Sequence, residues 1–436
     1  MKQPWYALFP STDGKATPAT FRSQLATKTA ADFHEHRIGA ICRITVVCFS
    51  LVTGLVFAPH AGAQTPGMWN PAGSMAVGRG TPTAILLQNG TVLVVGGASS
   101  ATSDLYDPVA NAWSTVGSMS TGRNYQAGTI LSDGRVLIAG GIDPNNVVLA
   151  TAEIYDPSTQ TWTPTGNLNT PRYMHSATLL PNGMVLVAGG WPGPGLYYGS
   201  GTYALTSSEL WDPATGTWTA TGDLPSPYAD HAAILLNSGK VLIAGGESYG
   251  QGGLGRAVIA TAATYDPFSG TWTSVPDMSA SRDHAPAVLM SDGTVLVAGG
   301  SPGACCGGQS TAERFDPNAL AWTSTPDMST GRDGPGASAI FNGEAVLISG
   351  GYSCCSDPNP TRASSEYFDL ATAAWHLTGS FIQARAYHTS ITLLDGTVLA
   401  VGGGFSSAER YYPDTKTYQT AAVQITSNVS TASPLR

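Results

Sequence analysis

The chain has 436 residues, of which only 11% are charged, and it contains 52 Gly and 29 Pro. Few charges and many turn-forming residues are typical of all-β repeat proteins and argue against a helical fold. The net charge is −9, and no stripe of basic residues runs along the chain. Nucleic acid is therefore not expected as a partner.

The first 63 residues have the features of a leader that carries a secretory signal. Arg37 and Arg43 precede an apolar run, 44–58, which is followed by the small residues Ala61-Gly62-Ala63. A basic flank, a short apolar core and small residues at positions −3 and −1 predict cleavage before Gln64. The run is short for a membrane span, and a membrane anchor is the alternative. We expect a secreted protein, extracellular or periplasmic, with no membrane attachment after cleavage.

From Trp69 onward the chain repeats one pattern seven times. Each unit has an apolar run that ends in Gly-Gly, then an aromatic-Asp-Pro-like triplet, then a Trp, which is replaced by Tyr418 in the last unit. The Gly-Gly pairs are Gly96-Gly97, Gly140-Gly141, Gly189-Gly190, Gly245-Gly246, Gly299-Gly300, Gly350-Gly351 and Gly402-Gly403. Such marks, recurring about every 50 residues, are typical of a radial array of four-stranded sheets.

The third unit shows how one repeat is built. Its strands are expected at 176–180, 185–188, 209–211 and 217–219. Asn182-Gly183 predicts a two-residue turn between the first two strands, because both residues tolerate positive φ. The continuous apolar run of the second strand suits burial on both faces. Asp212-Pro213 ends the third strand, because proline cannot continue a ladder.

Two nested hairpins per unit predict an all-β fold, a seven-bladed propeller of four-stranded antiparallel blades over 64–420, followed by a polar tail at 421–436. Trp69 precedes the first unit and is a candidate outer strand for the last blade, whereas Tyr418 offers a competing outer strand. Which of them closes the ring stays open at this point. Ring closure removes the exposed strand edges that would invite aggregation.

An arginine and an acid recur at fixed places in six of the seven units. The arginines precede the first strand, at Arg79, Arg123, Arg172, Arg282, Arg332 and Arg385. The acids lie in the third strand, at Asp104, Glu153, Glu209, Glu313, Glu366 and Glu409. The fourth unit has Tyr228 and Ala263 at these places. Their joint loss in one unit predicts that the two residues pair in the other six, because arginine–carboxylate pairs tie strands in a fixed geometry.

The residues just before each first strand form the richest polar cluster of the repeats. We expect them at the mouth of the central channel, on the same face as the loops after Gly-Gly. The candidate ligand-binding residues there are Tyr125, Gln126, His175, His231 and His284. The long loops 191–206 and 247–260 add aromatic candidates, Trp191, Tyr197 and Tyr198. Such rings suit sugars or proteins. The structural alternative is that the histidines bond neighbouring blades and the rings pack the loops down.

Beyond the predicted signal the chain keeps four cysteines, as two adjacent pairs in neighbouring units: Cys305, Cys306, Cys354 and Cys355. Both pairs lie in loops after Gly-Gly, so we expect them side by side on one face. In an oxidising compartment, disulfides between the two blades are favoured. Two vicinal disulfides, which are more strained, and a four-thiolate metal site are the alternatives.

The Gly-Gly, Tyr-Asp and Trp pattern resembles the kelch repeat over 69–420, which implies a seven-bladed kelch propeller. A narrower resemblance is to the propeller of galactose oxidase and glyoxal oxidase, the copper-radical oxidases. It rests on Tyr387-His388 within Arg385–Ser390, and on Tyr125 within Arg123-Asn124-Tyr125-Gln126. The resemblance implies copper ligands at Tyr387 and His388 and a radical tyrosine at Tyr125.

Two parts of the oxidase pattern are missing from this sequence. Thr81 stands where the family has the cysteine that cross-links to the radical tyrosine, and only a polar tail follows Tyr418 where the family has a further domain with a copper-binding histidine. We therefore expect a secreted module that binds a glycan or protein ligand, monomeric and without a cofactor. The alternative is a galactose/glyoxal oxidase-like copper enzyme that oxidises alcohols or aldehydes.

Overall fold

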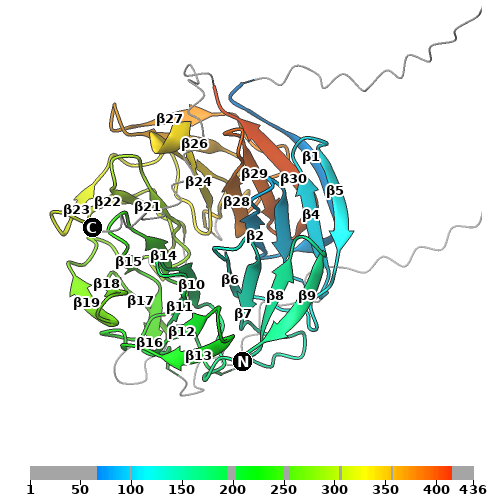
Figure 1. Ribbon diagram of the computed structural model, residues 1–436. Helices are drawn as coiled ribbons and strands as arrows, with labels where there is room; N and C mark the ends of the chain where they lie inside the picture. Colours follow the sequence, from blue (N-terminus) through cyan, green and yellow to red (C-terminus); the bar gives the residue numbers. More distant parts are fainter. Residues whose placement is uncertain are drawn as a thin grey trace, which may run out of the picture. The chain divides into compact units, whose positions relative to one another are not determined.

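A computed structural model describes residues 66–98, 100–193, 203–249, 256–303, 307–354 and 357–414. Seven four-stranded antiparallel sheets stand around a common centre, which confirms the all-β, seven-bladed propeller (Figure 1). Among these residues no helix is long and apolar enough to cross a membrane. The predicted leader, 1–63, and the polar tail, 421–436, lie outside the described residues.

The strands of each blade follow one another in sequence, from the inner to the outer edge. Blade 1 has β2 (Thr83–Leu86), β3 (Val92–Val95), β4 (Ser103–Asp107) and β5 (Ala112–Val116), and blade 2 has β6 (Ala127–Ile130), β7 (Val136–Ala139), β8 (Ala152–Asp156) and β9 (Thr161–Thr165). Blade 3 has β10 (Ser176–Leu179), β11 (Val185–Ala188), β12 (Ser208–Asp212) and β13 (Thr217–Ala220). Blade 4 has β14 (Ala232–Leu235), β15 (Val241–Ala244), β18 (Ala262–Asp266) and β19 (Thr271–Val275), and an added hairpin of β16 (Glu247–Tyr249) and β17 (Arg256–Val258).

The remaining blades keep the same order up to the last one. Blade 5 has β20 (Ala287–Leu289), β21 (Val295–Ala298), β22 (Ala312–Asp316) and β23 (Ala321–Ser324). Blade 6 has β24 (Gly336–Ile340), the 3-10 helix η1 (Phe341–Gly343), β25 (Ala345–Ser349), β26 (Ser365–Asp369) and β27 (Ala374–Thr378). Blade 7 has β28 (His388–Thr392), β29 (Val398–Gly402) and β30 (Phe405–Tyr412), and its outer strand is β1 (Met68–Arg79) from the start of the repeats.

The N-terminal strand therefore closes the ring, which answers the question that the sequence left open. Trp69 in β1 lies opposite Tyr411 in β30, and its indole N–H donates to Ser365 Oγ in blade 6 at 3.0 Å. Tyr418, the competing candidate, lies outside the described residues. Pairing the two ends of the repeat array covers the third strand of blade 7, so this blade has the same four strands as the others and β30 is not left as an exposed edge.

In blade 3, the turn between β10 and β11 differs from the prediction of a two-residue turn. Leu180 N–H donates to Met184 O at 2.8 Å, so the loop between them has three residues, not two. Only Gly183 has a positive φ, of 85°, whereas the Asn182 side chain accepts the Met184 N–H at 3.1 Å. The two-residue turn was wrong because Asn acts here through its side chain, which closes a local turn, and glycine alone supplies the left-handed residue.

The Gly-Gly pairs lie where neighbouring blades touch. Gly189 and Gly190 have φ of 64° and 95°, and the Gly190 N–H donates to Tyr228 O of the next blade at 2.8 Å. A Cβ on Gly189 would collide with that same carbonyl, and a Cβ on Gly190 would press on the Tyr173 carbonyl of its own blade. Glycine is needed at both places for its conformation and for its lack of a side chain.

Replacing Gly189 with alanine is expected to lower the free energy of unfolding by about 2–5 kcal/mol, from left-handed strain plus the clash between blades. Gly183→Ala is the matched control in the same blade, because its φ is also positive but its Cβ would have no neighbour closer than 3.8 Å. Chemical denaturation measures both. Equal losses of unfolding free energy in the two variants would show that the clash with the Tyr228 carbonyl adds nothing to the cost of the left-handed backbone.

Adjacent blades also share a core and a row of indole hydrogen bonds. All four residues of β11 are buried, and Val187 and Trp211 of blade 3 pack with Leu137 of blade 2. The outer-strand Trp218 donates its indole N–H to Gly166 O of the preceding blade at 2.8 Å. The tryptophans of the first six units are thus explained by indole hydrogen bonds that tie each blade to the blade before it.

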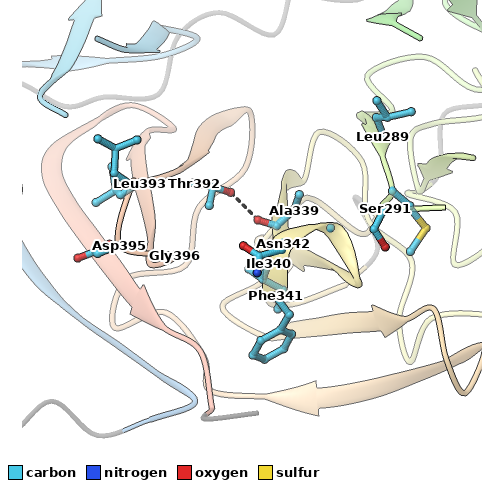
Figure 2. A pocket seen from close by; sticks show the side chains of 13 residues that line it. Leu289, Ser291, Ala339, Ile340, Phe341, Asn342, Thr392, Leu393, Asp395 and Gly396 are labelled. Carbon is cyan, nitrogen blue, oxygen red and sulfur yellow. Dashed lines mark hydrogen bonds between the residues drawn. The ribbon is translucent and has the colours of Figure 1, made fainter. Parts of the chain in front are cut away.

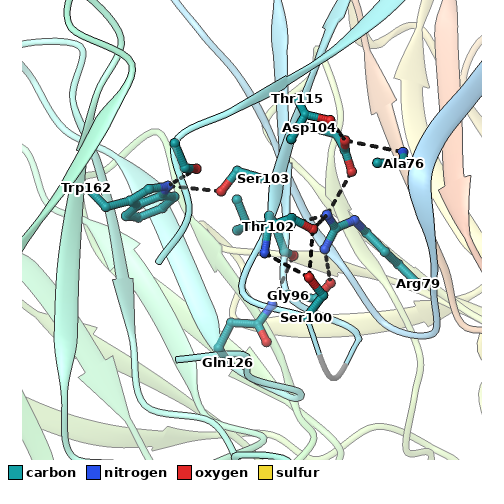
Figure 3. A network of polar contacts seen from close by, with 12 residues as sticks. Ala76, Arg79, Gly96, Ser100, Thr102, Ser103, Asp104, Thr115, Gln126 and Trp162 are labelled. Carbon is teal, nitrogen blue, oxygen red and sulfur yellow. Dashed lines mark hydrogen bonds and ion pairs between the residues drawn. The ribbon is translucent and has the colours of Figure 1, made fainter. Parts of the chain in front are cut away.

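The predicted arginine–acid pairs are confirmed in all six blades that carry both residues. The N–O distances are 2.7 Å for Arg79–Asp104, Arg123–Glu153 and Arg172–Glu209, and 2.9 Å for Arg282–Glu313, Arg332–Glu366 and Arg385–Glu409. Figure 3 shows the pair of blade 1, where Arg79 also donates to Gly96 O at 2.9 Å. In blade 4, Tyr228 and Ala263 are buried together in an apolar cluster instead.

Candidate functional site

Six residues stand just before the inner strands, at the end of the propeller where the loops after Gly-Gly lie, which is the predicted mouth. They share a left-handed backbone, with φ between 50° and 55°, and we call them the mouth ring: Tyr125, Met174, Asp230, His284, Gly334 and Tyr387. Backbone hydrogen bonds link neighbouring members, from Met174 N–H to Tyr125 O at 3.0 Å and from Asp230 N–H to Met174 O at 2.9 Å. The repeat therefore places one residue of each of these blades on a common circle.

His284 is the centre of an acidic cluster within this ring. Its Nε2 lies 2.6 Å from Asp230 Oδ2, and its Nδ1 lies 3.1 Å from Asp333 Oδ1 and 3.3 Å from Asp283 Oδ1. Burial by itself would lower the pKa of His284, but the carboxylates of Asp230, Asp283 and Asp333 raise it well above its usual value. At neutral pH the imidazole is therefore a cation held by carboxylates from blades 4, 5 and 6.

Tyr387 forms the exposed wall of the same cluster. Its hydroxyl donates to Asp333 Oδ2 at 2.6 Å, and its ring meets the His284 ring edge-on, with centroids 5.2 Å apart. Burial and the nearby Asp333 carboxylate raise the pKa of the phenol, so it stays protonated. With 38% of its surface exposed, Tyr387 offers solvent an aromatic face beside fixed hydrogen-bond acceptors.

The next residue of each repeat turns away from the mouth and into the interface with the preceding blade. Gln126 Nε2 donates to Thr83 Oγ1 at 2.9 Å, His231 Nε2 lies 3.0 Å from Ser176 Oγ, and His388 Nε2 lies 3.3 Å from Ser349 Oγ. A Cβ on Gly140 of the preceding blade would strike the imidazole of His175. These contacts are the ones expected if the histidines have a structural role and bond neighbouring blades.

Burial keeps these interface histidines neutral. It lowers the pKa of His231 to about 4 and that of His388 to about 3, and it lowers the pKa of His175 well below the usual range. At neutral pH each of these imidazoles is therefore uncharged, with a proton on only one of its two ring nitrogens. Burial lowers the pKa of these interface histidines, whereas carboxylates raise the pKa of His284, which stands one position earlier in the repeat.

The residues that the oxidase resemblance names do not fit a common copper site. Tyr387 reaches Asp333 at the mouth, whereas its neighbour His388 is 6% exposed and reaches Ser349 between blades. Tyr125 lies next to Tyr173, with ring centroids 6.3 Å apart, in a cluster with apolar side chains. The three side chains have three separate environments, and no ligand set is built from them.

Two other groups in the mouth have the donor atoms that a metal ion needs. Asp283, His284 and Asp333 form one group, and Asp230, Glu247 and His284 form the other, with the ligand atoms of each group within 4.8 Å of one another. Of these residues, only His284 is among the ligand-binding residues that the sequence predicts. The two aspartates, Asp283 and Asp333, lie one position before the ring residue, so comparing that position between repeats would have found them.

The remaining candidates have varied positions. Trp191 is 5% exposed and packs with Tyr173 and Ala204, so its ring lies inside the loops rather than on the surface. Tyr197 and Tyr198 lie outside the described residues. So do Cys305, Cys306 and Cys355, and the predicted disulfides stay predictions.

A pocket of about 590 Å³ lies at the other end of the inner strands, where turns of blades 5, 6 and 7 meet (Figure 2). Leu289, Phe341 and Leu393 are among its apolar lining residues. Its acid, Asp395, is ion-paired with Arg410. The lining has neither His nor Cys, so the mouth ring offers more chemistry than this pocket does.

Comparisons with known proteins agree with the repeat pattern. Residues 123–169, in blade 2, match the family described as Kelch motif, and no curated protein matches the chain. The fold is similar to that of a novel fungal alcohol oxidase of the AA5 family in complex with copper, with a TM-score of 0.63 and 19% identity over 80% of this chain and 77% of that one. It is also similar to the structure of YjhT, with a TM-score of 0.56 and 16% identity over 70% of this chain and 99% of that one. Identities this low show a common fold and leave the chemistry to each site. Seven blades share the Gly-Gly contacts, six of them carry the buried arginine–acid pair, and blade 2 is matched as a kelch motif, so the chain is a seven-bladed β-propeller with kelch-type repeats.

Proposed function

We propose that the protein is a secreted binding module that holds a glycan or protein ligand at the mouth ring. The observation that carries the proposal is the exposed Tyr387 ring beside the acceptor groups of Asp333 and Asp230. An aromatic face packs against the apolar side of a sugar or a side chain, and carboxylates accept hydrogen bonds from hydroxyl or amine groups. The export part of the proposal rests on the signal-like segment before Gln64.

Binding to a glycan array and to a panel of extracellular proteins tests the proposal. Tyr387→Ala is expected to weaken binding by about tenfold or more, as loss of an aromatic anchor does. Phe268→Ala is the matched control, because this ring is fully exposed in the turn after β18, at the opposite end of its blade. Absence of any ligand in both panels, or equal loss in the two variants, would contradict the proposal.

The alternative function is copper-dependent oxidation of an alcohol or aldehyde. It is supported by the resemblance to the copper-radical oxidases and by the similar fold of the copper-containing fungal enzyme. It is weakened by the separate environments of Tyr125, Tyr387 and His388 described above. Peroxide release by the copper-loaded protein from primary alcohols, lost in His388→Ala, would favour this alternative over the binding module.

A further inference from the structure

We propose that Asp283, His284 and Asp333 form a binding site for a divalent cation, Zn²⁺ in the first place, at the mouth ring. The ligand atoms are Asp283 Oδ1, His284 Nδ1 and Asp333 Oδ1. Imidazole nitrogen with carboxylate oxygens is a donor set that zinc accepts readily. Three protein ligands leave a fourth position for water or for an oxygen of a bound ligand.

The spacing of the donor atoms fits such an ion. His284 Nδ1 lies 3.3 Å from Asp283 Oδ1 and 3.1 Å from Asp333 Oδ1. Around a tetrahedral zinc ion with bonds of about 2.0–2.2 Å, neighbouring ligand atoms lie about 3.3–3.6 Å apart. Small shifts of these side chains therefore suffice for an ion to bind between the three atoms. The ion would replace the proton on His284 Nδ1.

Each of the two more accessible ligands is oriented by a further side chain. Asp230 Oδ2 lies 2.6 Å from His284 Nε2, so its carboxylate favours a proton on Nε2 and leaves Nδ1 as the nitrogen that gives up its proton to an ion beside Asp283 and Asp333. Tyr387 donates to Oδ2 of Asp333 at 2.6 Å and leaves Oδ1 for the ion. A carboxylate behind the imidazole is the usual companion of a metal-binding histidine, and it fixes the tautomer. Asp230 and Tyr387 are thus positioning residues.

The ligand residues are not part of the repeat pattern. At the same two positions blade 2 has Asn124-Tyr125, blade 3 has Tyr173-Met174 and blade 7 has Ala386-Tyr387. Carboxylates and imidazole occupy these positions only in the consecutive blades 4, 5 and 6. A packing role common to all blades does not explain why carboxylates and an imidazole occur at these positions in three neighbouring blades and in no other. The side chains of His284 and Asp333 are 24% and 13% exposed, so an ion can reach them from solvent.

The test measures zinc in the full chain after treatment with a chelator, loading with ZnCl₂ and desalting. The wild type is expected to retain about one zinc per chain, and His284→Ala and Asp333→Asn less than about one tenth of that. His376→Ala is the control, because His376 lies on the outer strand β27 of blade 6. Zinc is expected to raise the Tm of the wild type but not that of Asp333→Asn, a variant of nearly the same shape, which also reports whether the variant is folded.

A second variant tests the positioning role. Asp230→Asn is expected to weaken the zinc affinity by about 10–100-fold, the usual effect of removing the carboxylate behind a ligating histidine. No zinc retained by the wild type, or equal zinc in wild type and His284→Ala, would overturn the proposal. The site stands independently of the proposed ligand-binding function, because a protein that binds zinc and no glycan or protein partner would contradict only the latter.

Discussion

Arg172→Met is expected to lower the free energy of unfolding by about 3–5 kcal/mol, as the loss of one partner of a buried ion pair does. Arg172 is fully buried, and besides Glu209 it donates to Gly189 O at 2.8 Å and to Ser207 O at 3.0 Å. Methionine fills a similar volume but leaves the carboxylate of Glu209 buried without its counter-charge. Urea denaturation followed by tryptophan fluorescence measures the loss.

A double-mutant cycle separates the ion pair from the packing. In the Glu209→Gln background, Arg172→Met should cost at least about 1 kcal/mol less than in the wild type, because no charge is then stranded. Arg135→Met is the surface control: its pair with Asp133 is exposed, and its loss should change stability by less than about 1 kcal/mol. Additive effects of Arg172→Met and Glu209→Gln would mean that the two residues do not act together.

Acidification from pH 7 to pH 5 is expected to destabilise the propeller strongly through its interface histidines. Burial lowers the pKa of His388 to about 3 in the folded protein, so the unfolded chain takes up a proton there at a higher pH than the folded one. The stability that neutral His388 contributes is complete above pH 6.5 and is lost as the pH falls from about 6.5 toward 3. Between pH 7 and 5 the loss is about 2 kcal/mol for this histidine.

His231 and His175 act in the same direction, because burial lowers the pKa of both. Thermal melts over this pH range measure the combined effect. His388→Gln keeps a donor for Ser349 Oγ and removes the titration, so its stability should change less with pH by about 2 kcal/mol. His376→Gln, on the outer strand β27, is the control. An unchanged pH dependence in His388→Gln would show that His388 takes no part in the acid response.

Contacts between neighbours in the repeat were predictable from the sequence. The joint absence of the arginine and the acid in blade 4 was enough to predict the Arg172–Glu209 pair and its equivalents. The hairpins were predictable too, apart from the turn detail, where Asn182 uses its side chain rather than a positive φ. Seven copies of one pattern make such inferences possible, because each copy repeats the same contact at the same spacing.

The candidate site was predictable only in outline. The repeat register placed Tyr125, His284 and Tyr387 at the mouth, and the structure gives them the same left-handed backbone. The register did not show that the next residue of the repeat, such as His388, faces the preceding blade. Successive residues point in different directions at this place, one toward the mouth and the next toward the interface between blades. Nor could the register show that Asp333 lies between His284 and Tyr387.

The sequence by itself determined the seven blades, their four-stranded hairpins and the buried arginine–acid ties, because all of these follow from short-range marks copied in each unit. Only the tertiary structure decided that β1 closes the ring and that blades 4, 5, 6 and 7 bring His284, three aspartates and Tyr387 together. Trp69 and Tyr411 lie at opposite ends of the repeat array, and the site residues come from separate blades. Their meeting depends on the curvature of the complete ring, which no single repeat encodes.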